Sequence, residues 1–225
     1  MRPRAGRLTS LVGARRASEP ILLVEGLERR FGSRVVLTGI DISLQPGERL
    51  ALRGPNGSGK TTILRCIAGT VTPSKGHVLV AGHPWGSQEA RRAIGVSLSQ
   101  DRSFYLRLSG RDNLLFFAGV RGFRRAKARK LVRELEEELM LQPILDQRVD
   151  RCSTGMIQQL SFARALLGAP PILLLDEPTR SLDDAAAERF WGALDRRPAV
   201  TLLIATHRHE DLEHCHSSLS LDTGS

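Results

Sequence analysis

The sequence predicts an α/β fold in which a helical segment interrupts a core of buried strands. Two short apolar runs, PILLLDE at 171–177 and AVTLLIATH at 199–207, are typical of parallel strands buried on both faces. A glycine-rich loop at 54–62, GPNGSGKTT, lies between a predicted strand and a predicted helix. From about 101 to 160 the chain becomes helical in character. This alternation indicates an α/β core with a helical insertion.

The first hundred residues read mainly as strands. Pro46 and Gly47 form a pair typical of turns, so they break the second strand segment. Gly69 is expected to close the helix that follows the glycine-rich loop. The expected elements are strands over 21–31, 35–50 and 50–53, a helix over 60–69, and strands over 77–82 and 93–100.

The helical segment shows both a cap and an amphipathic face. Ser109 and Asp112 make an S-x-x-D capping pattern ahead of an apolar run. Within 124–141 the apolar residues share one face at helical spacing, and the opposite face is charged. These apolar residues are Leu131, Val132, Leu135 and Leu139.

The composition bounds the class of protein. The chain has 225 residues, 41% of them hydrophobic, which suffices for one compact domain with a core. No run of 18 or more apolar residues is present, so no membrane-spanning helix is predicted. Three cysteines, odd in number and never in a CxxC pair, fit a reduced, cytosolic protein. The formal net charge of +9 raises nucleic acid as a class of partner.

Much of the positive charge lies in two stretches. Residues 1–19 are arginine-rich, as in transit peptides and disordered tails, and we expect a flexible extension. The alternative is that residues 1–19 bind an anionic membrane surface electrostatically. The run RGFRRAKARK at 121–130 fits nucleic acid, membrane headgroups or a solvated face. The acidic run that follows it favours the solvated face.

The glycine-rich loop carries the strongest chemical signal. It matches G-x-x-x-x-G-K-[ST] in full and has the strand–loop–helix context that this pattern requires. Gly54, Gly57 and Gly59 let backbone N–H groups converge on phosphate oxygens at a helix N-terminus. Lys60 is expected to reach the β- and γ-phosphates, and the Thr61 hydroxyl to bind Mg²⁺. The alternative is a chance glycine-rich turn, which the context disfavours.

Two carboxylates lie at the end of the predicted buried strand PILLLDE at 171–177. Asp176 and Glu177 lie at its C-terminal end, where ligands of open α/β sheets bind. Asp176 is expected to hold Mg²⁺ through water, and Glu177 to polarise an attacking water as a base. Taken alone, Glu177 fits a solvated acid before Pro178 equally well. Together with the glycine-rich loop it favours hydrolysis of a nucleoside triphosphate.

With these motifs in this order, residues 20–222 resemble the nucleotide-binding subunit of ABC transporters, and look like the ABC-2 exporter type. The resemblance implies a P-loop NTPase (RecA-like) core over 20–100 and 161–222. It also implies an N-terminal antiparallel β subdomain and an inserted α-helical subdomain over 101–160. ATP and Mg²⁺ are the implied cofactors.

The resemblance assigns site positions along the chain. The loop at 54–62 corresponds to the Walker A motif, and ILLLDE at 172–177 corresponds to Walker B. The implied catalytic positions are Glu177, His207 (the switch histidine), Lys60 and Gln100 (the Q-loop glutamine), and the implied Mg²⁺ positions are Thr61, Gln100 and Asp176. The implied cofactor-binding positions are Phe31 (adenine stacking), Gly54, Pro55, Asn56, Gly57, Ser58, Gly59, Lys60, Thr61, Thr62, Ser153, Gly155 and Asp183 (in the D-loop, SLD).

The segment CSTGM at 152–156 stands at the family's signature position. From the residues alone, Ser153 fits a helix cap or an anion site at a helix start. In the family, two subunits sandwich two ATP molecules, and this segment meets the ATP of the other subunit. The resemblance therefore implies a nucleotide-dependent homodimer, or a heterodimer with another ABC ATPase. The departures from the family pattern are Cys152, Thr154, Met156 and Asp184, whereas Ser153 and Gly155 are retained.

The resemblance implies an ATP-hydrolysing subunit that powers export of a polysaccharide, lipid or drug. A separate transmembrane permease subunit is the implied partner. The chain itself is expected to be cytoplasmic and peripheral on the inner face of the cell membrane. Because the sequence ends with SLSLDTGS, no C-terminal accessory domain is expected. A soluble ABC ATPase acting on nucleic acid or the ribosome is the rival, supported by charge. The chain shows neither a second nucleotide domain nor a long coiled coil, so nucleic acid is not the expected partner.

A histidine-rich segment and a group of aromatic residues each allow more than one interpretation. The segment THRHEDLEHCH at 206–216 holds four histidines and a cysteine, which would suit a metal, but it has no fixed ligand pattern. Four aromatic residues after the Q-loop are expected partly in the core and partly in a groove for a membrane partner. These are Phe104, Tyr105, Phe116 and Phe117.

Overall fold

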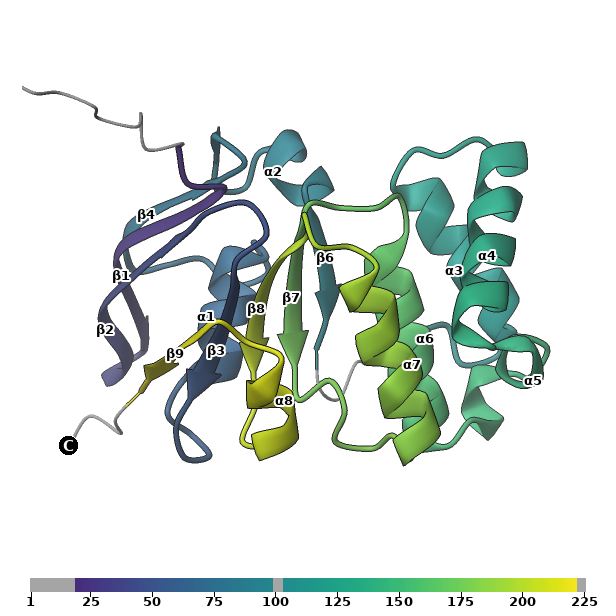
Figure 1. Ribbon diagram of the computed structural model, residues 1–225. Coiled ribbons are helices and arrows are strands. Elements are labelled where there is room, and N and C mark those ends of the chain that lie inside the picture. Colours follow the sequence, from purple (N-terminus) through teal and green to yellow (C-terminus); the bar gives the residue numbers. More distant parts are fainter. Residues whose placement is uncertain (1–18, 99–102, 222–225) are drawn as a thin grey trace, which may run out of the picture.

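The structure is a computed structural model that describes residues 19–98 and 103–221. Gln100 and nearly all of the predicted N-terminal extension lie outside the described residues. An antiparallel sheet, a parallel sheet and a group of helices follow one another across the molecule (Figure 1). The predicted α/β fold class is confirmed. None of the described helices combines the length and apolarity that crossing a membrane requires.

The central sheet consists of five parallel strands in the order β6-β7-β8-β3-β9. β7 and β8 come from the two apolar runs, and every residue in them is buried. Leu173 and Leu175 of β7 join the core on one face of the sheet, whereas Ile172 and Leu174 join the core on the other. Both faces are covered, so neither strand alternates with polar residues. The strands are β3 (Arg49–Arg53), β6 (Ile94–Ser97), β7 (Ile172–Asp176), β8 (Thr201–Ala205) and β9 (Ser217–Ser220).

The second sheet is antiparallel, with the order β2-β1-β4-β5, as the resemblance implied. Helix α1 (Lys60–Ile67) packs between it and the parallel sheet: Ile63 and Leu64 are fully buried in one core with residues of both sheets. The short helix α2 (Gln88–Arg92) adds Ala90 to the same core. The strands are β1 (Leu22–Phe31), β2 (Arg34–Leu44), β4 (Lys75–Val80) and β5 (His83–Pro84).

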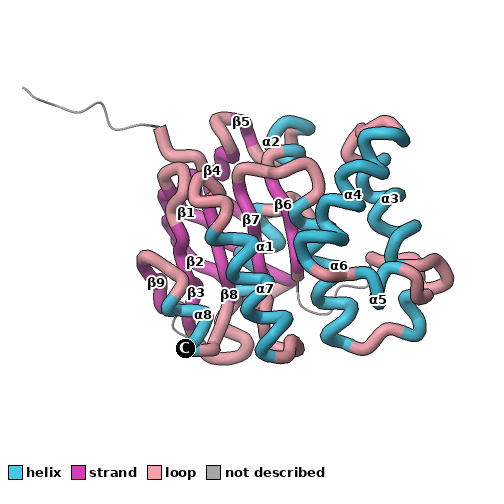
Figure 2. Tube along the Cα trace, turned by 45° about the vertical axis from the view of Figure 1, so that its right-hand side comes forward, coloured by secondary structure: helices cyan, strands magenta, loops and turns pink. Residues whose placement is uncertain are grey.

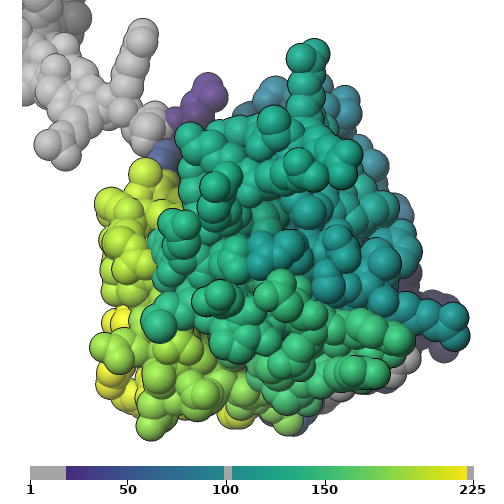
Figure 3. Space-filling model, turned by 90° about the vertical axis from the view of Figure 1, so that its right-hand side faces the viewer, coloured from purple at the N-terminus to yellow at the C-terminus, as the bar shows by residue number. Residues whose placement is uncertain are grey.

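Helices cover the other face of the parallel sheet and form most of the surface on that side of the molecule (Figures 2 and 3). Ser109 caps α3 as predicted, because its side chain accepts a hydrogen bond from the Asp112 N–H at 3.0 Å. The helices are α3 (Gly110–Val120), α4 (Arg125–Leu139), α5 (Gln142–Leu145), α6 (Thr154–Leu166), α7 (Asp184–Asp195) and α8 (His209–Glu213), with a 3₁₀ turn, η1 (Val149–Arg151).

The boundary expected between residues 160 and 161 falls inside α6, which is one continuous helix. Half of α6 therefore belongs to the helical segment and half packs on β6. The predicted apolar face of α4 is buried at Val132, Leu135 and Leu139, with Leu131 half-buried against the same core.

Gly95 in β6 sets how closely α6 approaches the sheet. A Cβ at this position would lie 2.0 Å from the Ala165 carbonyl oxygen and 2.6 Å from Leu173 Cδ2. The oxygen belongs to the backbone, so helix and strand would have to separate. We expect Gly95→Ala to lower the free energy of unfolding by about 3 kcal/mol, as overpacking does. Urea denaturation measures this, and Gly119→Ala, where no atom lies within 4 Å, is the control.

Glu138 joins α4 to the end of α7. Its carboxylate accepts hydrogen bonds from Arg197 at 2.5 and 2.7 Å and from Arg196 at 3.0 Å. The hydrogen bond from Arg197 is the main cause that holds the pKa of Glu138 below its usual range, against burial, which raises it. A carboxylate with a lowered folded-state pKa stabilises the fold above its unfolded pKa, and this contribution disappears as pH falls through the folded value.

We therefore expect acid to weaken the α4–α7 contact. Glu138→Gln should cost about 1 kcal/mol at pH 7 and less at pH 3, because the stabilisation by the carboxylate declines as pH falls below its unfolded pKa toward its lowered folded pKa. Urea midpoints measured from pH 7 to pH 3 check this. Glu134→Gln removes an exposed carboxylate of the same helix and is the control. A loss for Glu138→Gln that is the same at every pH would contradict the assignment.

Candidate functional site

The glycine-rich loop connects β3 to α1 and has the backbone that its glycines permit. Gly54, Gly57 and Gly59 have φ values of 145°, 86° and 98°, a region that other residues rarely occupy. Gly59 is the N-cap of α1 and carries no side chain to cap it. The first N–H groups of α1 therefore have no side-chain acceptor at the cap, and a bound anion could take that place.

Two polar side chains of the loop are buried. Lys60 is 7% exposed, and its Nζ donates to the Gly54 and Pro55 carbonyls at 2.6 and 3.1 Å. The Ser58 hydroxyl is buried without a hydrogen-bond partner among the described residues. A buried hydroxyl without a partner is costly. Both side chains thus have hydrogen-bonding capacity that a ligand with phosphate oxygens would use.

The C-terminal end of β7 faces this loop. The Thr61 hydroxyl donates to Asp176 Oδ2 at 2.9 Å, and Asp176 is 2% exposed. A hydroxyl and a carboxylate that lie this close are the oxygen donors that Mg²⁺ prefers. The residues present therefore fit the ion that the sequence implied.

Glu177 meets His207 beside this pair. The two side chains are joined at 2.8 Å through His207 Nδ1, and the Glu177 side chain is only 9% exposed. Glu177 has a φ of 49°, which is unusual for a residue other than glycine. Its N–H donates to the Ala205 carbonyl at 2.7 Å. This hydrogen bond to the backbone of β8 fixes the position of the Glu177 backbone, from which its side chain extends.

A cavity of about 430 Å³ lies where the glycine-rich loop meets Asp176 and Glu177. Six of the predicted residues other than Thr61, Asp176 and Glu177 line it, among them Phe31, which is 48% exposed. Arg34, Val36 and Arg180 also line it and were not predicted, because no motif contains them. The lining residues are Phe31, Arg34, Val36, Asn56, Gly57, Gly59, Lys60, Thr61, Thr62, Asp176, Glu177 and Arg180.

The signature segment does not line this cavity. Ser153 is the N-cap of α6: its hydroxyl accepts from the Met156 N–H at 3.2 Å, and Met156 Sδ accepts from the Ser153 N–H at 3.4 Å. A Cβ on Gly155 would lie 2.4 Å from the Ser181 carbonyl oxygen. Asp183 caps α7 by accepting from the Ala186 N–H at 2.7 Å. These residues form a second polar region, separate from the glycine-rich loop.

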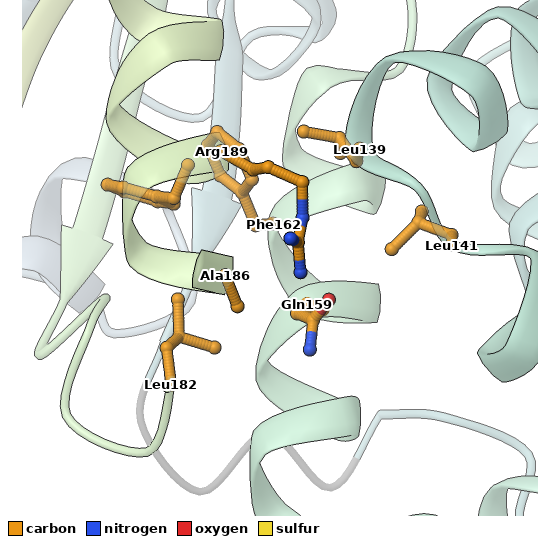
Figure 4. A pocket seen from close by; sticks show the side chains of 8 residues that line it. Leu139, Leu141, Gln159, Phe162, Leu182, Ala186 and Arg189 are labelled. Atoms are coloured by element: carbon orange, nitrogen blue, oxygen red, sulfur yellow. The ribbon is translucent and has the colours of Figure 1, made fainter. Parts of the chain in front are cut away.

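Two further hollows lie elsewhere. A very small one, about 10 Å³, has room for roughly one water and lies between α4, α6 and α7 (Figure 4). The Arg189 side chain extends toward Gln159 there, and its Nε is buried without a partner among the described residues. A larger hollow of about 570 Å³ lies between α2, β6 and α3. Its lining includes Arg91, Arg92, Arg121, Arg164, Ile94, Val96, Phe117 and Val120.

The histidine-rich segment forms no metal cluster. His209 pairs with Glu213 at 3.5 Å, whereas His216 Nδ1 accepts from the Arg49 N–H at 3.1 Å. The described part of the chain has no group of three or more His, Cys, Asp or Glu side chains that could hold a metal ion.

Comparison with known proteins agrees with this geometry. The family model described as "ABC transporter" matches residues 37–180. Nod factor export ATP-binding protein I of Burkholderia thailandensis is 38% identical over 204 residues, which are 88% of this chain and 66% of that protein. The "uncharacterized ABC transporter ATP-binding protein YdbJ" of Bacillus subtilis is 35% identical over 201 residues, with 87% of this chain and 64% of that protein covered.

The fold agrees as well. A solved ATP-binding subunit of an ABC transporter matches with a TM-score of 0.82 and 25% identity, over 91% of this chain and 88% of that one. The chain spans slightly less than two thirds of the length of the two curated relatives. It belongs to the ABC transporter family, with the fold of the ATP-binding subunit.

Proposed function

We propose that this chain hydrolyses ATP to drive a membrane exporter. The observation that carries the proposal is the cavity in which the glycine-rich loop meets Asp176 and Glu177. Phosphoryl transfer needs positioning and charge stabilisation more than covalent chemistry, and this cavity offers both. The name of the Burkholderia relative, an export ATP-binding protein, supports the direction of transport.

The triphosphate is expected along the loop, with the adenine on Phe31. Lys60 would exchange its bonds to the Gly54 and Pro55 carbonyls for phosphate oxygens, and the Ser58 hydroxyl would gain a partner. Thr61 and Asp176 would hold Mg²⁺, which neutralises phosphate charge when bound. Arg34 and Arg180 add their positive charges to that of Lys60, in a cavity that also holds the carboxylates of Asp176 and Glu177.

Glu177 accepts the proton of the attacking water in this scheme. Its low exposure keeps bulk water away, and its contact with His207 orients the carboxylate. On proton uptake by Glu177, the His207 ring, more than half exposed, is free to turn toward the phosphate that leaves. Gln100 lies outside the described residues, so its proposed role rests on the family resemblance.

A second subunit would complete the site. Ser153 and the N-terminus of α6 offer N–H donors and a hydroxyl, but in a region apart from the chain's own cavity. In a head-to-tail dimer each α6 N-terminus would face the ATP of the other subunit, where an anion is favourable. The partner subunit is a second copy or another ABC ATPase.

We assign the hollow between α2 and α3 to the transmembrane partner, at the inner face of the membrane. Its lining combines apolar side chains, among them the exposed Val120, with four arginines. The exposed rings of Tyr105 and Phe116 adjoin it through ring contacts that lead to Phe117. This combination fits an amphipathic segment with acidic side chains.

Phosphate release from MgATP by the purified chain tests the proposed activity, with Lys60→Ala as the inactive control. Sedimentation with cell membranes tests the docking: Arg91→Glu with Arg92→Glu should shift the chain to the supernatant. Arg129→Glu with Lys130→Glu, a charge reversal on α4 away from the hollow, should not. No turnover under any nucleotide concentration would contradict the enzyme, and equal sedimentation of both double variants would contradict the docking site.

A further inference from the structure

Asp211 is a buried carboxylate that the site described above does not use. It lies in the short helix α8 and has no solvent exposure. Its Oδ1 accepts a hydrogen bond from the Thr179 hydroxyl at 2.6 Å, and its Oδ2 accepts one from the Thr206 hydroxyl at 2.7 Å. Both threonines are themselves buried. One carboxylate therefore joins two segments that are 27 residues apart in the chain, counted from 179 to 206.

These two segments carry the reacting pair. Thr179 lies two residues after Glu177, and Thr206 immediately precedes His207. Arg208 reinforces the bridge, because its N–H donates to the Thr206 hydroxyl oxygen at 3.1 Å and its side chain donates to the Thr179 carbonyl at 2.9 Å. The contact between Glu177 and His207 at 2.8 Å thus joins the same two segments that this buried network connects.

Burial of this polar network costs free energy of folding, so we expect it to have a functional role. No ion pair of Asp211 is found among the described residues, and each of its two carboxylate oxygens accepts a hydrogen bond from a threonine hydroxyl. A buried carboxylate of this kind is disfavoured relative to a well-packed apolar side chain. The positive φ of Glu177 adds strain that the surroundings must hold in place. The hydrogen bonds from the Thr179 and Thr206 hydroxyls to the Asp211 carboxylate restrain the backbone near Glu177.

We propose that Asp211 is a positioning residue of the ATPase: it fixes the segment after Glu177 against the segment before His207, so that the two side chains meet. This inference rests on the proposed function. Asp211 does not itself touch the nucleotide cavity. It acts through Thr179 and Thr206, and its loss should slow the chemical step and leave the binding of ATP intact.

The test compares Asp211→Asn with Glu213→Gln, a carboxylate-to-amide change on the same helix at an exposed position. We expect Asp211→Asn to lower kcat by at least about tenfold with KM for ATP unchanged within about twofold. Glu213→Gln should keep both constants. In a His207→Ala background Asp211→Asn should lower kcat by less, because part of its effect passes through the lost contact. Equal lowering in both backgrounds, or an unchanged kcat, would overturn the proposal.

A second pair of variants covers the case in which Asp211→Asn does not fold. Thr206→Val keeps the shape but removes the hydroxyl, whereas Thr206→Ser keeps the hydroxyl. The first should lose at least about tenfold in kcat and the second less than about threefold. Wild-type turnover near zero would refute the proposed function instead. The crystal structure of Thr206→Val then decides for Asp211: a lengthened His207–Glu177 distance supports positioning, and an unchanged one overturns it.

Discussion

Glu177→Gln is expected to release phosphate from MgATP at least about 100-fold more slowly than the wild type. The amide cannot accept the proton of the attacking water, but it keeps the size of the side chain. It can also keep a hydrogen bond to His207, now 2.8 Å away. Lys60, Thr61 and Asp176 are untouched, so the nucleotide still binds. ATP should therefore accumulate in the closed, dimeric state.

Single-turnover phosphate release and size-exclusion chromatography in MgATP measure both effects. Glu188→Gln, an exposed glutamate on α7, is the matched control and should turn over normally. Residual hydrolysis above about one tenth of the wild-type rate would show that another group takes the proton.

Mixing two inactive variants should restore activity when their defects lie in different halves of one site. Lys60→Ala disables the loop that holds the triphosphate. Gly155→Asp places a carboxylate at the start of α6, and its Cβ would lie 2.4 Å from the Ser181 carbonyl. If each site takes its loop from one subunit and α6 from the other, a mixed dimer has one intact site. An equal mixture should then recover about one quarter of the wild-type rate, since half of the dimers are mixed and each has one site of two.

The matched control mixes Lys60→Ala with Glu177→Gln. Both residues line the same cavity of one chain, so every site in the mixed dimer carries a defect and no activity returns. If turnover recovers in the control mixture but not in the first mixture, the loop and the α6 N-terminus of each site come from the same subunit, and the proposed arrangement is wrong. Turnover is measured after subunit exchange at fixed total protein.

Sequence patterns predicted the parts of this fold that depend on local chemistry. The apolar runs became β7 and β8, because burial on both faces leaves no place for polar residues. The loop glycines stand where positive φ values are needed, and Ser109 and Ser153 both cap helices. These features are determined within a few residues along the chain, so a single sequence contains them.

The features that were missed depend on distant contacts. Arg34 and Arg180 reach the cavity from a hairpin and from a turn, and no spacing rule connects them. Asp211 lay within a segment that suggested a metal site, because spacing shows neither burial nor the two threonines that it contacts. The pairing of Met156 Sδ with the Ser153 N–H had no sequence signal, since a thioether is a weak acceptor.

The contact between Gly155 and Ser181 has a consequence for how two active sites would communicate. In the proposed dimer, Gly155 lies next to the nucleotide bound by the neighbouring subunit. Ser181 lies four residues after Glu177, which acts on the nucleotide bound by the same chain. Because Gly155 has no side chain, the start of α6 lies close against the Ser181 carbonyl, and we expect a shift of one to move the other. Loss of the γ-phosphate at one site would therefore displace the base at the other. Turnover should then depend on ATP concentration more steeply than a single-site curve allows, with a Hill coefficient between about one and two.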